Sequence, residues 1–451
     1  MTMKDENGNE YVMFRNHRID VTWYASEGNG LYISGLTEQV RNIAEIEGFD
    51  ELTDLEWLNL NFNDIKRIKG LEHLTNLKSL SLGCIEASRI EGLETLTKLE
   101  HLELGGNKIS KIEGLENLTR LKSLNLVFNN IPKIEGLEHL TNLKSLNLGH
   151  IGTSKIEGLE TLTKLEYLDI LDYKISKIEG FENLTSLKSL RLSYKNISKI
   201  EGLDSLTDLE YLSLQFNKIK EIEGLESLAN LKHLSLFNNQ ISEIKGLENL
   251  KKLEWFDLSD NKIVKIKGLD NLVNLKHLSL CNNQISEIKG LDNLVNLKSL
   301  TLYNNQISEI KGLENLKRLE ILDLSKNKIV EIKGLDNLVN LKRLILFNNQ
   351  ISEIKGLDNL VNLRLLFLYV NKILEIKGLN SLTNLERLDL SMNPISIVKG
   401  LENLRNLCSL TLNDTQIRQK PNIDYLPRLK NEFFSCLEGI THKYYYEKRI
   451  P

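Results

Sequence analysis

The chain has 451 residues, of which 41% are hydrophobic and 27% are charged, and its formal net charge is −4. This composition is ordinary for a soluble protein, and the slightly acidic balance argues against a nucleic-acid-binding protein, which usually carries a basic stripe. No apolar run is long enough to cross a bilayer, and the first ten residues lack the apolar stretch of a signal peptide.

The four cysteines are Cys84, Cys281, Cys408 and Cys436, and no two of them have the spacing of a metal or redox motif. We therefore expect reduced thiols, a cytoplasmic protein and no membrane association.

Residues 1–54 are predicted to be an N-terminal cap. Two segments rich in β-forming residues, Tyr11–Phe14 and Ile19–Tyr24, flank Asn16 and His17 and predict a short hairpin. A degenerate repeat starting at residue 33 follows, with Gly48 at its expected place. We expect this cap to cover the open end of the sheet, because exposed strand edges pair with other chains.

Residues 55–428 consist of seventeen units of 22 residues with no insertion or deletion. Residues 275–296 show the unit most clearly: L-K-H-L-S-L-C-N-N-Q-I-S-E-I-K-G-L-D-N-L-V-N. With unit residues numbered 1 to 22, strand alternation points positions 4 and 6 inward and positions 3, 5 and 7 outward. A fixed period of this length is typical of a solenoid, in which the outward positions of stacked parallel strands form one face.

Two positions of the unit have a structural explanation. Position 9 is usually Asn, whose amide can satisfy the buried backbone groups of a turn and repeat from unit to unit as a ladder. Position 16 is Gly in the first sixteen units, which fits a positive φ or a close backbone approach. The ladder Asn is replaced at Ile85, Ile151, Tyr173, Lys195 and Thr415. These gaps indicate either a tolerated irregularity, which we prefer, or a local change of curvature near a contact site.

The repeat pattern ends in the last unit, where Lys420 and Asn422 replace the usual Ile and Gly. Apolar residues then recur at helical spacing from Leu429 to Ile440. We predict that residues 429–451 are a capping helix and a tail.

The 22-residue length and the L-x-x-L-x-L-x-x-N and I-x-x-I-x-G-L-x-x-L phrases resemble one class of leucine-rich repeat proteins. That class includes regulatory subunits of protein phosphatase one and the bacterial internalins. The resemblance covers roughly residues 33–428. It implies an α/β leucine-rich repeat solenoid, a right-handed horseshoe or arc, with a parallel sheet on the concave face and 3₁₀ turns or extended chain on the convex face. It also implies no catalysis and a protein partner on the concave face.

An internal comparison favours that face as the binding surface. Residues 231–296 and 297–362 match at 55 of 66 positions, and eight of the 11 differences lie at positions 3, 5, 7 or 8 of the unit. The duplicated scaffold therefore stayed constant while the concave face changed, although chance among few events is the alternative.

Two groups of residues on this face are the candidate protein-binding sites, because exposed apolar patches mark interaction sites and aromatic residues and Arg anchor them. The first group is Tyr167, Tyr211, His233, Phe237, Trp255, Asp257 and His277. The second group is Tyr303, Ile321, Arg343, Ile345, Phe347, Leu365, Phe367, Tyr369 and Arg387.

The function predicted from these observations is a non-catalytic protein-binding scaffold or regulator. A self-associating structural protein is the alternative, and we expect a monomer rather than a homodimer. An enzyme has no support, because nucleotide-binding, metalloprotease and serine-hydrolase motifs do not occur in the sequence. We expect no cofactor and no metal. The partner is an unidentified protein; a phosphatase or another signalling protein is a candidate, although no phosphatase-specific residue set matches.

Overall fold

A computed structural model describes residues 3–7, 9–15, 17–24, 28–33, 39–153, 155–171, 174–194, 196–418, 426, 428 and 429. The chain forms two compact units, Met1–Lys262 and Ile263–Pro451. The predicted capping helix at 429–451 lies outside the described residues apart from Leu429, and so do the ladder gaps at Tyr173 and Lys195.

The N-terminal residues form two small antiparallel pairs. Strand β2 (Glu10–Phe14) pairs with β1 (Met3–Lys4) on one side and with β3 (His17–Asp20) on the other, which confirms the predicted hairpin. Its second strand ends before Val21, and β4 (Thr22–Tyr24) pairs instead with β5 (Gly28–Tyr32). Strand β5 is also the first of the parallel ladder, since it pairs with β6 (Trp57–Asn59).

The first unit differs from the template that starts at residue 33. Leu31 of β5 pairs with Leu58 and therefore lies 27 residues before its partner, whereas later partners are 22 apart. The strand is at residues 28–32, and two 3₁₀ helices, Ile43–Glu45 and Phe49–Glu51, occupy the later part of the unit. Gly48 still has a left-handed backbone with φ +80. The additional residues of this unit therefore fall between strand β5 and Gly48.

Each later repeat contributes one three-residue strand that pairs in parallel with the strand of the preceding repeat. In residues 1–262 these are β6, β7 (Ser79–Ser81), β8 (His101–Glu103), β9 (Ser123–Asn125), β10 (Ser145–Asn147), β11 (Tyr167–Asp169), β12 (Ser189–Arg191), β13 (Tyr211–Ser213), β14 (His233–Ser235) and β15 (Trp255–Asp257).

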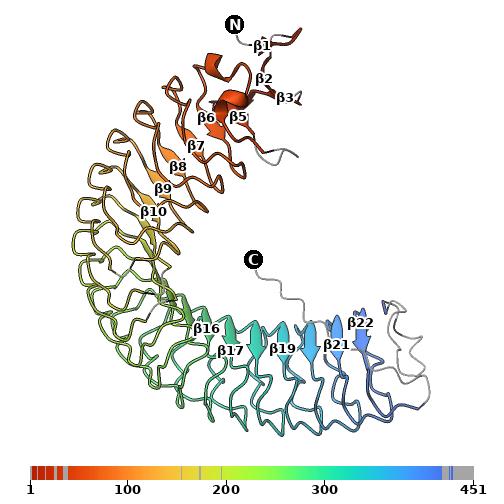
Figure 1. Ribbon diagram of the computed structural model, residues 1–451. Helices are drawn as coiled ribbons and strands as arrows, with labels where there is room; N and C mark the ends of the chain where they lie inside the picture. Colours follow the sequence, from red (N-terminus) through yellow and green to blue (C-terminus); the bar gives the residue numbers. More distant parts are fainter. Residues whose placement is uncertain are drawn as a thin grey trace. The chain divides into compact units, whose positions relative to one another are not determined.

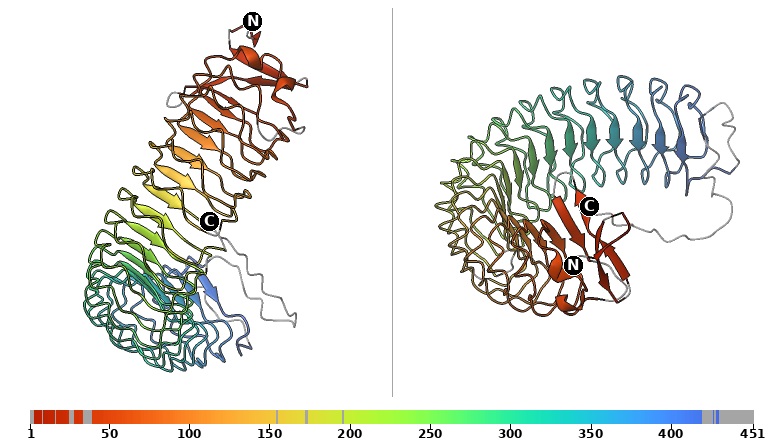
Figure 2. Two further views of the ribbon diagram at one scale, coloured as in Figure 1. Left: turned by 60° about the vertical axis from the view of Figure 1, so that its left-hand side comes forward. Right: turned by 90° about the horizontal axis from the view of Figure 1, so that it is seen from above.

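In residues 263–451 they are β16 (His277–Ser279), β17 (Ser299–Thr301), β18 (Ile321–Asp323), β19 (Arg343–Ile345), β20 (Leu365–Phe367), β21 (Arg387–Asp389) and β22 (Ser409–Thr411). Within each unit the strands lie side by side on the inner side of the curve, and the turns lie on the outer side (Figures 1 and 2).

The core repeats as strictly as the sequence. In residues 121–142 the side chains at positions 1, 4, 6, 11, 14, 17 and 20 are at most 1% exposed, namely Leu121, Leu124, Leu126, Ile131, Ile134, Leu137 and Leu140. The convex side closes with two successive turns, in which Leu140 N donates to Leu137 O at 3.0 Å and Leu143 N donates to Leu140 O at 2.9 Å. The described residues contain no α-helix, and the leucine-rich repeat solenoid is confirmed.

The ladder asparagines bond in the predicted way. Asn129 accepts from Ile109 N at 3.0 Å and donates to the carbonyls of Leu104 at 3.0 Å and Leu126 at 2.9 Å, so that it joins two neighbouring repeats. Where Thr415 replaces Asn, its hydroxyl keeps one of these bonds, to Leu412 O at 2.9 Å.

The repeated glycine meets both of its predicted requirements. Gly136 has φ +82, and a Cβ added to it would lie 2.2 Å from Ile112 O of the preceding repeat. A side chain would therefore collide with backbone and also strain the left-handed conformation.

Candidate functional site

The concave face consists of the side chains at positions 3, 5 and 7. The inward residues at positions 4 and 6 are buried throughout the described repeats, so the alternation derived from the sequence fixes which side chains can meet a partner.

The unit 263–451 carries an aromatic group, which we call the Phe347 cluster: Tyr303, Phe347, Phe367 and Tyr369, with Arg343 and Lys326 beside them. The Phe347 and Tyr369 rings stack with centroids 4.4 Å apart at 8°, and the Tyr303 ring lies 6.2 Å from Phe347. All four rings are half-buried and so remain partly open to solvent.

Two cations accompany these rings. The Lys326 ammonium lies 5.0 Å from the Tyr303 centroid, and the Arg343 guanidinium lies 5.8 Å from that of Phe367. A cation over an aromatic face is attracted by the negative charge density of the ring. The cluster thus combines apolar surface, flat rings and a positive rim.

The apolar neighbours of this cluster differ in exposure. Ile321 and Leu365 are half-buried and Arg387 is exposed, as expected for outward positions. Ile345 is only 7% exposed, which corrects the prediction that it contributes open surface. Its register partners on the two neighbouring strands are Asp323 and Phe367.

The unit 1–262 has a row of rings at position 3. The ring centroids of Tyr211 and His233 are 6.0 Å apart, and those of His233 and Trp255 are 6.5 Å apart. Tyr167 is 51% exposed, two strands before Tyr211. Of the first predicted group, His277 alone belongs to the unit 263–451, where it is exposed.

A second row of rings runs along the other end of the same strands. Phe237 at position 7 meets Phe216 edge to face with centroids 5.0 Å apart, and Phe216 stacks on Tyr194 at 4.3 Å and 8°. The predicted residue Phe237 is thus part of a larger aromatic surface over β12 to β14.

Phe216 and Tyr194 belong to a set that the sequence reasoning missed: aromatic residues at position 8 with a positive φ. Phe62, Phe128, His150, Tyr194 and Phe216 have φ between 54 and 60. Phe62 and Phe128 are 61% and 60% exposed. An aromatic residue at position 8, directly before the ladder position, is the signal that could have identified them.

Position 5 also places carboxylates on the concave face. Burial raises the pKa of Glu103, Asp257 and Asp323, and bonds from neighbouring backbone or side-chain groups oppose that shift. Arg343 further opposes it at Asp323, whereas Asp260 adds to it at Asp257.

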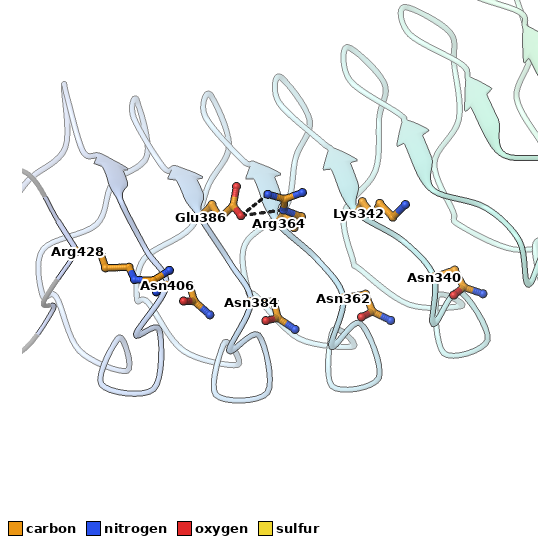
Figure 3. A pocket seen from close by; sticks show the side chains of 8 residues that line it. All are labelled: Asn340, Lys342, Asn362, Arg364, Asn384, Glu386, Asn406 and Arg428. Carbon is orange, nitrogen blue, oxygen red and sulfur yellow. Dashed lines mark hydrogen bonds and ion pairs between the residues drawn. The ribbon is translucent and has the colours of Figure 1, made fainter.

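The N-terminal ends of the strands carry a different kind of surface, shown in Figure 3. A pocket of about 380 Å³ is lined by Asn340, Lys342, Asn362, Arg364, Asn384, Glu386, Asn406 and Arg428. Arg364 Nε donates to Glu386 Oε1 at 2.8 Å, and Asn362 and Asn384 donate to backbone carbonyls of the preceding repeats. These bonds hold neighbouring repeats together, so we assign this pocket a structural role.

The part of the chain that the structure describes has three free thiols and neither a metal-binding cluster nor a membrane-spanning helix. No group of three or more His, Cys, Asp or Glu residues there could hold a metal ion. No helix of the described residues has the length and apolar character to span a membrane. Cys84, Cys281 and Cys408 are free thiols.

Comparison with known proteins identifies the class of the chain. The family profile described as leucine-rich repeats (2 copies) matches residues 53–95, 97–140, 119–160 and an overlapping series from 185–227 to 317–359. These matches cover more than half of the sequence. The chain belongs to the leucine-rich repeat family, whose members generally act as binding scaffolds.

Solved structures support this assignment. A leucine-rich repeat protein of Leptospira interrogans is 30% identical, with a TM-score of 0.74 over 88% of this chain and 100% of that one. An internalin of Listeria monocytogenes is 28% identical, with a TM-score of 0.52 over 81% of this chain and 88% of that one. Toll of Drosophila, solved in complex with Spatzle, shares the fold at 22% identity and a TM-score of 0.60, over 77% and 55%. No curated protein sequence matches the chain.

Proposed function

We propose that this leucine-rich repeat protein is a non-catalytic scaffold that binds a protein partner on its concave face. The observation that carries the proposal is the Phe347 cluster. Phe347 and Tyr369 present stacked, half-buried rings to solvent, although the same repeat position holds Ser259 and Ser325 elsewhere. The scaffold therefore does not need aromatic residues there, and water-exposed rings cost free energy unless a partner covers them.

The variation between the two duplicated blocks supports the same surface. Cys281 and Ser279 in the first block correspond to Phe347 and Ile345 in the second, while the core differs at a single position, Phe256 against Leu322. The complex of Toll with Spatzle is an example of this fold engaging a protein ligand. Aromatic and Arg side chains are also the usual energetic anchors of protein interfaces, which suits Phe367 and Arg343.

Self-association is the second candidate function, since the Phe347 cluster of one molecule could cover that of another. We propose a monomer. Light scattering of the purified protein, measured over a range of concentrations, distinguishes the two. We also propose a cytoplasmic location, which suits the free thiols of Cys84, Cys281 and Cys408 and is checked by cell fractionation.

The test of the binding surface is the double variant Phe347→Ser and Phe367→Ser. Both side chains lie outside the core, so folding should be nearly unchanged while capture of the partner from source-cell lysate is lost. The matched control is Val295→Ser and Val339→Ser, which removes convex side chains that are 48% and 43% exposed. The control should capture the same proteins as the unmodified chain.

The possible results separate cleanly. A double variant that unfolds would mean that these rings support the fold. A folded double variant that still captures the same proteins would place the site elsewhere on the surface. Dissociation of a dimer by the double variant would favour self-association.

A further inference from the structure

Asp257 is a carboxylate on the concave face without a cation. It is at position 5 of β15, and its Oδ1 accepts from Ser259 N at 2.9 Å. Among the described residues no basic side chain pairs with it, and the like-charged Asp260 raises its pKa further. Such a half-buried, uncompensated charge is unfavourable for the folded chain on its own.

The same surface shows how this chain compensates such a carboxylate elsewhere. Asp169, at position 5 of β11, lies 3.7 Å from Arg191 of the next strand, and the Arg191 guanidinium lies 5.2 Å from the Tyr211 centroid. An aspartate, a guanidinium and an aromatic ring thus form one arrangement. Asp257 has the aspartate and, two residues before it, the ring of Trp255, but it lacks the cation.

The duplicated block repeats the comparison. Asp323 stands at the position equivalent to Asp257, and Arg343 lowers its pKa by its charge. In the first block the residue equivalent to Arg343 is His277. The second block therefore has a guanidinium, that of Arg343, at this place, whereas the first block has the imidazole of His277.

A second and independent feature lies next to Asp257. Ser235, its partner on β14, is 1% exposed, and its hydroxyl has no hydrogen-bond partner. A buried hydroxyl without a partner is unfavourable, because most buried polar atoms are hydrogen-bonded. Position 5 points to the concave side, so this hydroxyl and the Asp257 carboxylate face the same way. The half-buried Asp257 carboxylate can accept from one polar ligand group, and the enclosed Ser235 hydroxyl on the neighbouring strand adds an unsatisfied polar group beneath the same surface.

The surroundings indicate what carries that group. The row Tyr211, His233 and Trp255 and the row Tyr194, Phe216 and Phe237 flank positions 5 and 7 over β12 to β15. Four strands span about 15 Å, which matches about four residues of extended polypeptide. Between the rows lie small hydroxyl side chains, Ser193 and Ser213, whose Oγ atoms are 3.1 Å apart. A peptide, whose side chains can contact both rows of rings, fits this surface better than a free small cation.

We propose that the concave surface over β12 to β15 receives an extended segment of the protein partner, and that an Arg or Lys side chain of this segment pairs with Asp257, next to Ser235 and Trp255. This inference rests on the proposed function and specifies the partner's chemistry at a second part of the concave face. The basic group supplies the charge that Asp257 lacks, and flanking apolar side chains contact the two rows of rings.

The test uses the full-length protein, immobilised and exposed to a display library of random 12-residue peptides. Enriched peptides should share an Arg or Lys at one position, with apolar or aromatic neighbours. By titration calorimetry, Asp257→Asn should weaken a recovered peptide at least about tenfold, while Asp323→Asn leaves its affinity unchanged. Replacing the peptide's basic residue by Gln should weaken binding equally and add no further loss in Asp257→Asn.

Folding of the variants provides a separate readout. In Asp257→Asn the side-chain oxygen can still accept from Ser259 N, and Ser235→Ala removes a hydroxyl that has no hydrogen-bond partner. Both variants should therefore melt at or above the melting temperature of the unmodified protein. A lower melting temperature for both would mean that these groups serve the fold, and would overturn the proposal.

The remaining results also decide. Recovery of no peptide, peptides without a basic residue, or equal binding by Asp257→Asn would each contradict the proposal. So would spermine binding more tightly than any peptide, or an Asp257-dependent dimer in sedimentation. If the partner captured through the Phe347 cluster is unaffected by Asp257→Asn, this inference fails while the proposed function stands. If basic peptides bind at Asp257 but the Phe347→Ser and Phe367→Ser variant still captures its partner, the proposed binding surface at the Phe347 cluster fails while this inference stands.

Discussion

Replacing Asn305 by Ala should destabilise the protein far more than replacing its neighbour Asn304. Asn305 is a ladder residue and 8% exposed, whereas Asn304 is exposed. Asn305 Oδ1 accepts from Ile285 N at 3.0 Å, and Nδ2 donates to the carbonyls of Leu280 at 2.9 Å and Leu302 at 3.1 Å.

The magnitude follows from what each group has left. The Leu302 and Leu280 carbonyls keep bonds from the ladder residues Asn327 and Asn283. Ile285 N loses its only acceptor and is left in the core, which costs about 1–3 kcal/mol. With the two shared bonds, each about 0.5–1.5 kcal/mol, the total for Asn305→Ala is about 2–6 kcal/mol.

Asn304→Ala has a different and smaller cost. Asn304 has φ +54 and donates to Asn282 at 2.8 Å on the surface, so Ala loses little more than the left-handed preference, about 1 kcal/mol. Asn304→Gly removes the side chain without that strain and should be nearly neutral.

The assay is urea denaturation followed by circular dichroism, combined with amide hydrogen exchange. Exchange is needed because stability in a repeat array is partly local, and the Ile285 amide reports directly on the lost bond. Equal urea midpoints for Asn305→Ala and Asn304→Gly, with Ile285 exchange unchanged, would refute the assigned register.

Three further outcomes are expected. Gly136→Ala should lower the urea midpoint strongly and Gly152→Ala only slightly. Both glycines have a positive φ, 82 at Gly136 and 88 at Gly152. An added Cβ would lie 2.2 Å from Ile112 O at Gly136 but 3.7 Å from the nearest atom at Gly152. Equal decreases of the urea midpoint would exclude the backbone collision as the cause. Lys188 and Lys144 hold the pKa of Glu166 at about 2, below its ordinary 4.5. The stabilisation is therefore complete above pH 4.5 and is lost as pH falls toward 2, so the midpoint difference between the unmodified protein and Glu166→Gln should close over that interval. A difference that stays constant with pH would contradict this ion pair. Phe62→Asn should stabilise the protein by up to about 1 kcal/mol, because Asn tolerates the left-handed backbone at φ +60 better than Phe; a lower melting temperature would show that the exposed ring packs on the fold.

The repeat made most of the fold predictable. A period of two within each strand and of 22 between strands determines which side chains enter the core, and Leu146 pairing with Leu168 follows directly. Gly136 and Asn129 could be assigned physical roles because a turn has only a few ways to satisfy its backbone.

The repeat template that starts at residue 33 misplaced the first strand, which is at Gly28–Tyr32. The alternation of Leu31 and Ile33 is that of a repeat strand, but glycines at 28 and 30 are weak strand formers and the distance to Gly48 is longer than the template allows. Trp57 explains the glycine at 30, since an added Cβ would lie 1.6 Å from its ring. That requirement arises from a neighbour 27 residues away, and no local pattern contains it.

The candidate site was less predictable because exposure depends on neighbours. Alternation alone placed Ile345 on the open face, yet flanking side chains bury it, while Ser235 is buried in the same way with its hydroxyl unpartnered. Which carboxylates lack a cation is likewise a property of adjacent strands, as Asp169 and Asp257 show.

The aromatic residues at position 8 have a positive φ, which the fold tolerates but for which it does not require an aromatic side chain. Position 8 has nearly the same φ throughout, and in the unit 263–451 it is Asn at 282, 304 and 348, the residue type that accepts a left-handed backbone most easily. Phe128 and Phe216 adopt that conformation at a cost of about 1–2 kcal/mol each. Phe128 adds an exposed ring, stacked on His150 at 4.7 Å, that the core does not use. Asn at position 8 of other repeats shows that this backbone cost can be avoided. We infer that the cost at Phe128 and Phe216 is offset by an interaction outside the repeat. Contact with the proposed partner along this end of the strands would supply that compensation, and it would extend the candidate surface of the unit 1–262 beyond positions 3, 5 and 7.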